Sequence, residues 1–259
     1  MRRGCSRLAS ALHLRTLLSP FGIGISKRIE LVSNRHSIGA LIANQNVPAG
    51  TPLLLAPDAA LLTCQGALDA DVNGLVPPPA EMIALLKDHT AQLDHVYLAY
   101  YLSLRIFTDT EGWFAGQIRR FSKDRRCCQA NPANLRIWEK FARGSVTAPA
   151  PIFLAAMQYV SESSFRKPAT KDVSSSASPP AALVVAPVVD VAVRSHSAAN
   201  TTLRNTTVKG VKEAYLHGDI AGARQALSGK DGDNVYWVLI ASEDISVGSE
   251  VSFSSHHSL

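Results

Sequence analysis

Residues 188–200 (VVDVAVRSHSAAN) combine the side-chain types that are best suited to chemistry in this chain. A carboxylate, a hydroxyl and an imidazole follow one another closely, at Asp190, Ser195 and His196. They could activate a serine for acyl transfer, or they could line a loop that binds a cofactor. The hydrolase hypothesis is disfavoured, because these residues are too close in sequence for a usual triad and the chain has no nucleophile-elbow motif. The stretch is therefore either a cofactor loop or the polar end of a strand.

Short strands and a helical middle must position this stretch. Residues 29–63 are strand-like apolar runs broken by turns at 48–50 and 57–58, and strand-like runs return at 182–193 and 234–245. Between them, residues 80–107 and about 151–165 have helical patterns, and no internal repeat is apparent. Strands, then helices, then strands predict an α+β architecture in one domain.

The first of these helices carries an aromatic stripe. Large apolar side chains recur near helical spacing at Leu93, Tyr97, Tyr100, Tyr101, Leu104 and Phe107. Such a stripe could stack nucleic-acid bases, but it is more typical of a helix face that packs against a core. We therefore expect a core stripe.

Composition and charge limit the classes of protein. With 46% hydrophobic and 18% charged residues, the 259-residue chain can bury a core. The net charge of +5 allows an acidic partner such as RNA without requiring one. No segment approaches the roughly 18 apolar residues of a membrane span. The four cysteines, Cys5, Cys64, Cys127 and Cys128, include no C-x-x-C pair and are expected to be reduced thiols without a zinc site.

The N-terminal segment is basic. Residues 1–28 contain arginines and lysine among Ser, Ala and Leu, and the first acid is Glu30. This composition is typical of a mitochondrial presequence, whereas a secretory signal needs an unbroken apolar run. A disordered basic tail is the alternative. We expect a targeting segment and a mitochondrial location.

Three segments, taken in order, resemble the SET-domain proteins of the Rubisco large-subunit type of protein-lysine methyltransferase. They are ALIANQNVPAGTPLLLAPDAALLT (40–63), WFAGQIRRF (113–121) and ASEDISVGSEVSFSS (241–255). The resemblance implies a SET-like, β-rich α+β fold of short strands with a helical insert. It divides the chain into targeting segment 1–28, N-terminal strands 29–78, helical insert 79–168, flexible loop 169–182 and C-terminal SET part 183–259.

The resemblance also implies a site that binds S-adenosylmethionine and admits a lysine. The implied cofactor-binding residues are Gly39, Asp190, Arg194, Ser195, His196 and Asn200, and Ser255 stands where the family has its catalytic tyrosine. Four family motifs build this site: a Gly-x-Gly turn, a Ser-Arg-x-Phe, a cofactor loop and the closing tyrosine. Each of them is degenerate here. At least one of the two family glycines is replaced, since either Ile38 and Ala40 or Ser37 and Gly39 stand at their positions. Phe165 keeps its place although the Ser-Arg before it is Glu162-Ser163.

The cofactor loop of the family, Pro-x-x-Asp-x-x-Asn-His-Ser, is only partly retained. Pro187 and Asp190 match, whereas Val193 and Arg194 occupy the Asn-His positions. A hydrocarbon side chain cannot replace the donor and acceptor of an Asn amide. A two-residue insertion would instead bring Ser195 and His196 into those positions, followed by Asn200.

These losses favour a catalytically inactive SET-like protein that serves as a mitochondrial scaffold or assembly factor in a protein or ribonucleoprotein complex. Five cations, Arg119, Arg120, Lys123, Arg125 and Arg126, could contact RNA phosphates, although such a cluster is more often a solvated face. The alternative is an active lysine methyltransferase in which Gly39, His196, Asn200 and Ser255 form a reduced site. The active methyltransferase would use S-adenosylmethionine as its cofactor, whereas the inactive scaffold would use no cofactor.

Overall fold

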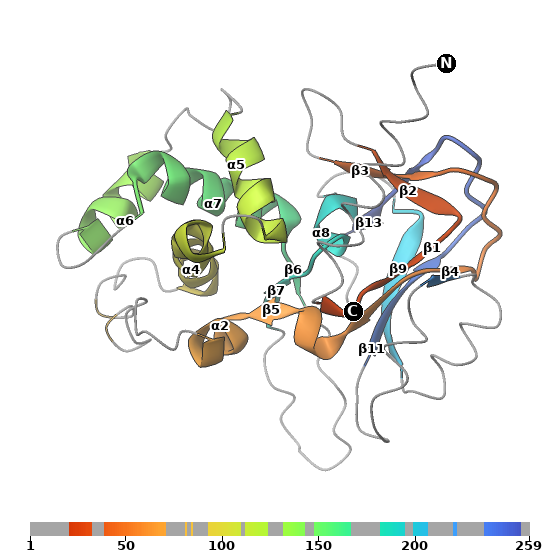
Figure 1. Cartoon of the computed structure of the whole chain (residues 1–259), viewed down its shortest axis with the longest axis horizontal. Coiled ribbons are helices and arrows are strands. Elements are labelled where there is room, and N and C mark those ends of the chain that lie inside the picture. The colour runs from red at the N-terminus through yellow and green to blue at the C-terminus, as the bar shows by residue number, and fades with distance from the viewer. Residues whose placement is uncertain are drawn as a thin grey trace, which may run out of the picture. The chain divides into compact units, whose positions relative to one another are not determined.

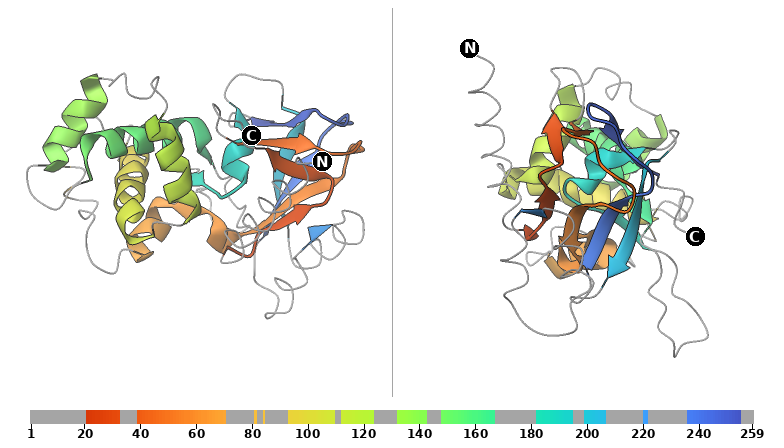
Figure 2. Two further views of the ribbon diagram at one scale, coloured as in Figure 1. Left: turned by 45° about the horizontal axis from the view of Figure 1, so that its top comes forward. Right: turned by 90° about the vertical axis from the view of Figure 1, so that its right-hand side faces the viewer.

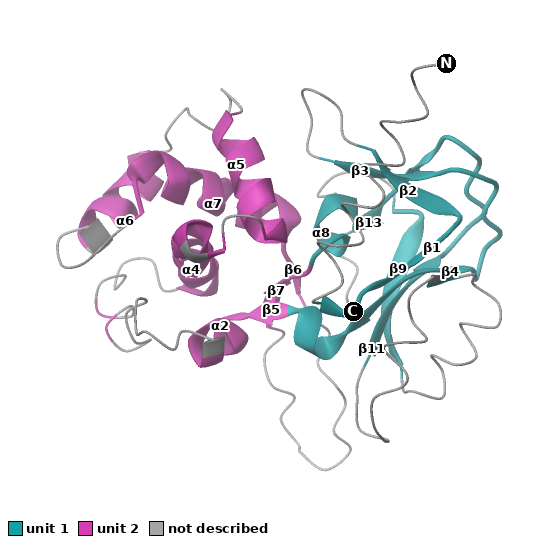
Figure 3. Ribbon diagram, viewed as in Figure 1, with its two compact units in different colours: residues 1–34, 39–61, 187–254 teal, residues 35–38, 62–186, 255–259 magenta. Residues whose placement is uncertain are grey.

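The computed structural model describes residues 21–32, 39–70, 81, 84, 93–109, 112–123, 132–142, 148–166, 182–194, 199–206, 220–221 and 236–254. Its strands and helices confirm the predicted α+β class (Figure 1). The chain forms two compact units (Figure 3). The first comprises residues 1–34, 39–61 and 187–254, and the second comprises residues 35–38, 62–186 and 255–259.

The first unit contains two sheets in its described part. The larger has the strand order β10 (Ile220–Ala221), β1 (Gly24–Ser26), β4 (Pro52–Pro57), β11 (Tyr236–Ala241), β9 (Thr201–Thr206), β13 (Phe253–Ser254) and β8 (Val193–Arg194). The smaller has the order β12 (Glu250–Val251), β3 (Ala40–Ala43) and β2 (Ile29–Val32). Strands β4 and β11 lie side by side in the middle of the larger sheet (Figures 1 and 2). Their unbroken apolar sequences suit strands that are buried on both faces.

Strand β1 falls inside the segment predicted to target the protein. Ile25 pairs with Leu54 of β4 on one side and with Ala221 of β10 on the other, and Ser26 is buried. Removing all of residues 1–28 would therefore delete a strand from the sheet and expose the edge of β4. A shortened chain for experiments has to begin before Gly24 to retain this strand.

Two turns that are distant in sequence pair with each other by reciprocal backbone hydrogen bonds. Val47 and Ile245 exchange two N–H···O bonds of 2.8 Å. The N–H of Gly50 donates to the carbonyl of Ala241 (2.8 Å), and the N–H of Gly248 donates to that of Ala43 (2.7 Å). The two turns are thus related by an approximate two-fold axis.

The side chains follow the same symmetry. Asp244 Oδ1 accepts from the N–H of Ala49 at 2.8 Å, and Asn46 Oδ1 accepts from the N–H of Val247 at 3.0 Å. In sequence, ALIANQNVPAG at 40–50 corresponds to VLIASEDISVG at 238–248. The expectation that the chain has no internal repeat is therefore wrong. The repeat is short and mostly similar rather than identical, so its symmetry becomes clear only when the turns pair.

The second unit is largely helical in its described part. Its helices are α2 (Cys64–Ala70), α4 (Leu93–Thr108), α5 (Trp113–Lys123), α6 (Pro132–Ala142) and α7 (Ala150–Ser163). A small sheet, β5 (Leu62–Thr63), β7 (Leu183–Val185) and β6 (Phe165–Arg166), completes it, and η2 (Asp58–Ala60) belongs to the first unit. Helix α7 contacts α4, α5 and α6. It confirms the helix expected at about 151–165, with Pro151 in its first turn, where proline costs no hydrogen bond.

The tyrosine stripe belongs to the core, as predicted. Tyr97, Tyr100 and Tyr101 are at most 6% exposed, and so are all the other residues from Val96 to Leu102, as well as Ile106. Helix α4 is therefore buried all round, which fits its contacts with α2, α5 and α7. The assignment of Phe107 to the stripe is wrong, because its side chain is 57% exposed. Periodicity gives the face of a helix, but neighbouring elements decide how far along the helix that face is covered.

Candidate functional site

The segment before the candidate loop is not a continuous strand. Strand β7 ends at Val185, and Val189–Ala192 form a single helical turn, α8, before β8 begins (Figure 1). The single strand expected over 182–193 is therefore wrong between Val185 and Val193, where β8 begins. Pro187 has no N–H for a sheet ladder and so ends the run locally.

Val188 has an unusual backbone conformation at the start of this turn. Its φ is 69°, and it alone among the described non-glycine residues has a positive φ. A branched side chain crowds the backbone in that region, at a cost of roughly 1–3 kcal/mol. Its side chain is fully buried, so the surrounding packing holds the conformation.

Asp190 lies in this turn and is only 2% exposed. Val189 and Val191 on either side of it are equally buried. A carboxylate in such surroundings has to be compensated by the protein, and Asp190 does interact with other groups of the fold. It is thus an internal component of the first unit, not a polar side chain at the end of a strand.

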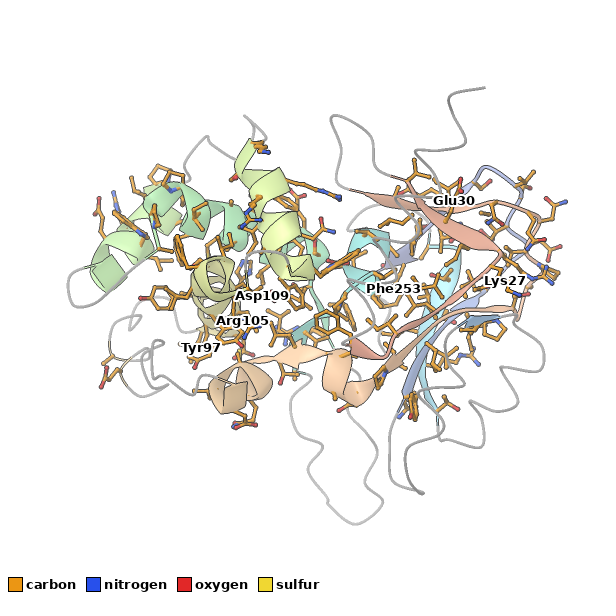
Figure 4. The ribbon with its side chains drawn as sticks, in the orientation of Figure 1. Lys27, Glu30, Tyr97, Arg105, Asp109 and Phe253 are labelled. Carbon is orange, nitrogen blue, oxygen red and sulfur yellow. The ribbon has the colours of Figure 1, made fainter. Side chains whose placement is uncertain are left out.

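Three strands around the candidate loop run in the same direction. Strand β13 lies between β8 and β9 and is parallel to both, with Phe253 paired to Val193 on one side and to Thr201 on the other. Ser254 pairs with Arg194. The side chains of Phe253, labelled in Figure 4, and of Val193 are buried. The last strand of the chain therefore inserts between two strands that are consecutive in sequence.

This arrangement separates the candidate residues. Ser195, His196 and Ser255 lie outside the described residues, but they follow Arg194 and Ser254, the paired last residues of β8 and β13. Asn200 precedes the first residue of β9 and is level with Ser252. Ser254 is two positions after Ser252, which is about 7 Å along a strand. Asn200 is thus at the opposite end of β13 from Ser254.

The amide of Asn200 is bonded to the closing segment of the chain. Its Nδ2 donates to the carbonyl of Glu250 at 2.8 Å, and its Oδ1 accepts from the N–H of Ser252 at 2.8 Å. Thr201 bonds to the same segment, since its N–H and its Oγ1 both donate to the carbonyl of Ser252, at 3.1 and 2.7 Å. Sequence reasoning missed Thr201 and Ser252, because no local pattern links residues fifty positions apart.

Gly39 is buried directly before β3. It contributes no side chain, so any contact with a ligand would come from its backbone. The side chain of Arg194 lies outside the described part of the structure, although its backbone belongs to β8.

The second unit contains two half-buried ionisable groups that were not predicted as site residues. Burial, and secondarily the carboxylate of Asp94, raise the pKa of the Cys64 thiol, whose Sγ donates to the Asp94 carbonyl at 3.3 Å. Burial lowers the pKa of His95, and its hydrogen bond to the carbonyl of Met157 (2.9 Å) partly opposes this. A protonated thiol is a poor nucleophile and a poor metal ligand. The half-buried His95, bonded to the core helix α7, has a structural role.

Two other kinds of site are absent from the described ranges. No group of three or more His, Cys, Asp and Glu side chains there could hold a metal ion. None of the described helices is long and apolar enough to cross a membrane.

The basic cluster is partly on the surface of α5. Arg120 and Lys123 are exposed, one turn apart, whereas Arg119 is half-buried and interacts with other groups. Arg125 and Arg126 lie outside the described residues. The exposed part of the predicted cluster in α5 therefore consists of two cations.

Comparison with known proteins finds similarity among solved structures. No protein-family model matches the chain, and no curated protein matches it. Among solved structures, it is similar to the SET domain of LSMT, crystallised with lysine and AdoHcy, at 12% sequence identity and a TM-score of 0.46. The alignment covers 96% of this chain and 54% of that one, so the chain spans about half the length of that protein.

Proposed function

We propose that this chain is a SET-like domain that has lost methyl transfer and serves as a scaffold or assembly factor in a mitochondrial protein or ribonucleoprotein complex. The observation that carries the proposal is the buried apolar stretch around Asp190. Val193, which stands where the family has an asparagine, is 4% exposed and pairs with Phe253 in the sheet. A hydrocarbon in that place supports the fold and offers nothing to a polar cofactor.

The pairing of the sequence motifs supports the SET-like part of the proposal. The segments 40–63 and 241–255, which resemble the opening and the closing of a SET domain, meet in the structure. Strand β12 pairs with β3, and the two turns exchange hydrogen bonds. Segments that a resemblance assigns to one fold are expected to pack together, and these do.

The described candidate residues support a chain that does not bind S-adenosylmethionine. Asn200 uses both sides of its amide on the closing segment, Asp190 is internal to the fold, and Gly39 has no side chain. A cofactor carboxylate, amine and adenine each need hydrogen-bonding groups that face them. We therefore derive no reaction step through this cofactor.

Calorimetric titration of S-adenosylmethionine, and of its demethylated product, tests the proposal. The chain should begin at Ser19, because a chain that lacks residues 1–28 also lacks β1. We expect no binding heat from a sample whose folding is verified by circular dichroism. Micromolar binding of either compound would contradict the proposal and favour the active methyltransferase. That alternative further requires methyl transfer to a protein lysine that is lost in His196→Ala.

The surface of α5 is the proposed contact for an RNA component of the complex. The double variant Arg120→Glu with Lys123→Glu should weaken binding to a mixed-sequence RNA. It should also lower the slope of log Kd against log salt concentration by about 2, because each exposed cation contacts about one phosphate. The matched control is Arg136→Glu with Lys140→Glu, two exposed cations of α6.

Fluorescence anisotropy over a range of salt concentrations measures both pairs. An equal loss in the two double variants would mean that only net charge matters. Unchanged binding in the α5 variant would remove this surface from the proposal, while the scaffold role for a protein partner would remain.

The composition of residues 1–28 supports mitochondrial import. Since β1 has to remain in the sheet, processing that preserves the fold would cleave before Gly24.

A further inference from the structure

Strand β13 has very little backbone pairing to hold its position. It pairs at two residues with β8 and at one residue with β9. Longer strands are held in register by many ladder bonds and by alternation of buried and exposed side chains. Both residues of β13, Phe253 and Ser254, are buried, so alternation gives it little register information.

The residue before β13 is bonded more extensively. Ser252 is 6% exposed, its N–H donates to Asn200 Oδ1, and its carbonyl accepts from both the N–H and the Oγ1 of Thr201. Asn200 Nδ2 also holds the carbonyl of Glu250. The backbone of Asn200 is itself fixed, because its carbonyl accepts from the N–H of Ser242 at 2.9 Å. These bonds hold the chain at the point where it enters between β8 and β9.

We propose that Asn200 and Thr201 form a clasp that sets the register of β13, and that Asn200 is a positioning residue instead of a cofactor contact. Through Ser252 the clasp determines which residue lies opposite Arg194, and therefore where the chain leaves the sheet after Ser254. The functional relevance of this exit rests on the proposed SET-like function, in which Ser255 occupies the position of the catalytic tyrosine.

The geometry favours a register role over general support. The side-chain bonds of Asn200 reach Ser252, directly before β13, and Glu250 in the preceding strand β12. A side-chain amide that bonds an N–H and a C=O two residues apart recognises one alignment of the backbone. A shift of β13 by one residue would present a different N–H and carbonyl to Asn200 and would break this match. A shift by two would leave the buried faces unchanged but would still lose the bonds to Ser252.

Disulfide trapping in the full chain tests the proposal. With the four native cysteines replaced by Ser, Arg194→Cys with Ser254→Cys reports the observed register. Arg194→Cys with His256→Cys reports a shift of two residues. Paired positions of neighbouring strands meet the Cα separation that a disulfide needs, whereas positions shifted by two residues do not. We expect the first pair to cross-link at least tenfold faster than the second.

Removal of the clasp should change the ratio of the two rates. In Asn200→Ala with Thr201→Val, the preference for the first pair should fall at least fivefold. The same β9 strand supplies a matched control in Asn205→Ala with Thr206→Val, which repeats the two residue types away from β13 and should keep the original preference. Asn200→Asp, which retains the acceptor for the Ser252 N–H, should give an intermediate ratio.

A ratio that stays at the wild-type value in the clasp variant would overturn the proposal. The proposal would also be overturned if the cross-linking rates of the two cysteine pairs changed by the same factor. Simple destabilisation changes both rates without selecting a register. The rate ratio does not depend on binding of S-adenosylmethionine. The clasp can therefore fail while the proposed function stands, and the calorimetric test can fail while the clasp stands.

Discussion

Phe153→Ala is expected to lower the free energy of unfolding by about 3–5 kcal/mol, the usual cost of truncating a large aromatic side chain in a core. Phe153 is fully buried on α7, and its ring packs edge-on against that of Tyr100 on α4, with the ring centroids 6.3 Å apart. Helix α7 also contacts α5 and α6, so a cavity at this point affects the centre of the helical unit. Urea unfolding followed by far-ultraviolet circular dichroism measures the change.

Phe107→Ala is the matched control. Phe107 is an aromatic residue in the last turn of α4, where Arg105 and Asp109 form a salt bridge of 3.4 Å (Figure 4). Because the Phe107 side chain is 57% exposed, its removal should change stability by less than about 0.5 kcal/mol. If the two substitutions cost the same, the assignment of Phe153 to the core and of Phe107 to the surface would be incorrect.

Gly50→Ala and Gly248→Ala should each cost about 1–2 kcal/mol, and about 2–4 kcal/mol together if the effects add. Their φ angles are 80° and 83°, in the left-handed region where a Cβ strains the backbone. An added Cβ would meet no atom within 4 Å at either glycine, so backbone strain is the whole cost. The N–H groups of both glycines bond to the opposite turn, so strain in one turn can weaken the other.

Gly116→Ala provides the control of opposite sign. Gly116 is an exposed residue in the middle of α5, with no atom within 4 Å of an added Cβ. Alanine there should stabilise the protein by about 0.5–1 kcal/mol, since it lowers the entropy of the unfolded chain and favours the helix. Thermal unfolding of the four variants, including the double glycine variant, measures all of these changes.

The double variant also tests the two-fold relation of the turns. Neighbouring sites that share hydrogen bonds usually depart from additivity, whereas distant sites add within about 0.5 kcal/mol. A non-additive cost for Gly50 and Gly248 would indicate that the turns act as one unit. Strict additivity would indicate two independent turns that happen to lie side by side.

The sequence by itself determined the elements that depend on local pattern. The apolar runs of β4 and β11 predicted buried strands, and the spacing of Tyr97, Tyr100 and Tyr101 predicted a core helix. Periodicity and turn residues act over a few positions, so they can be read from one chain. The α+β class follows from the order of these elements. The mitochondrial location and the partner remain predictions from composition.

Only the tertiary structure decided the features that join distant residues. The insertion of β13 between β8 and β9, the bonds from Asn200 to Ser252, and the pairing of the two turns all link segments separated by long stretches of chain. Asn200 was a reasonable cofactor contact by sequence, since an amide can serve a ligand or a strand equally well. Which of the two it serves depends on the group that the fold brings within hydrogen-bonding distance, and no local pattern carries that information.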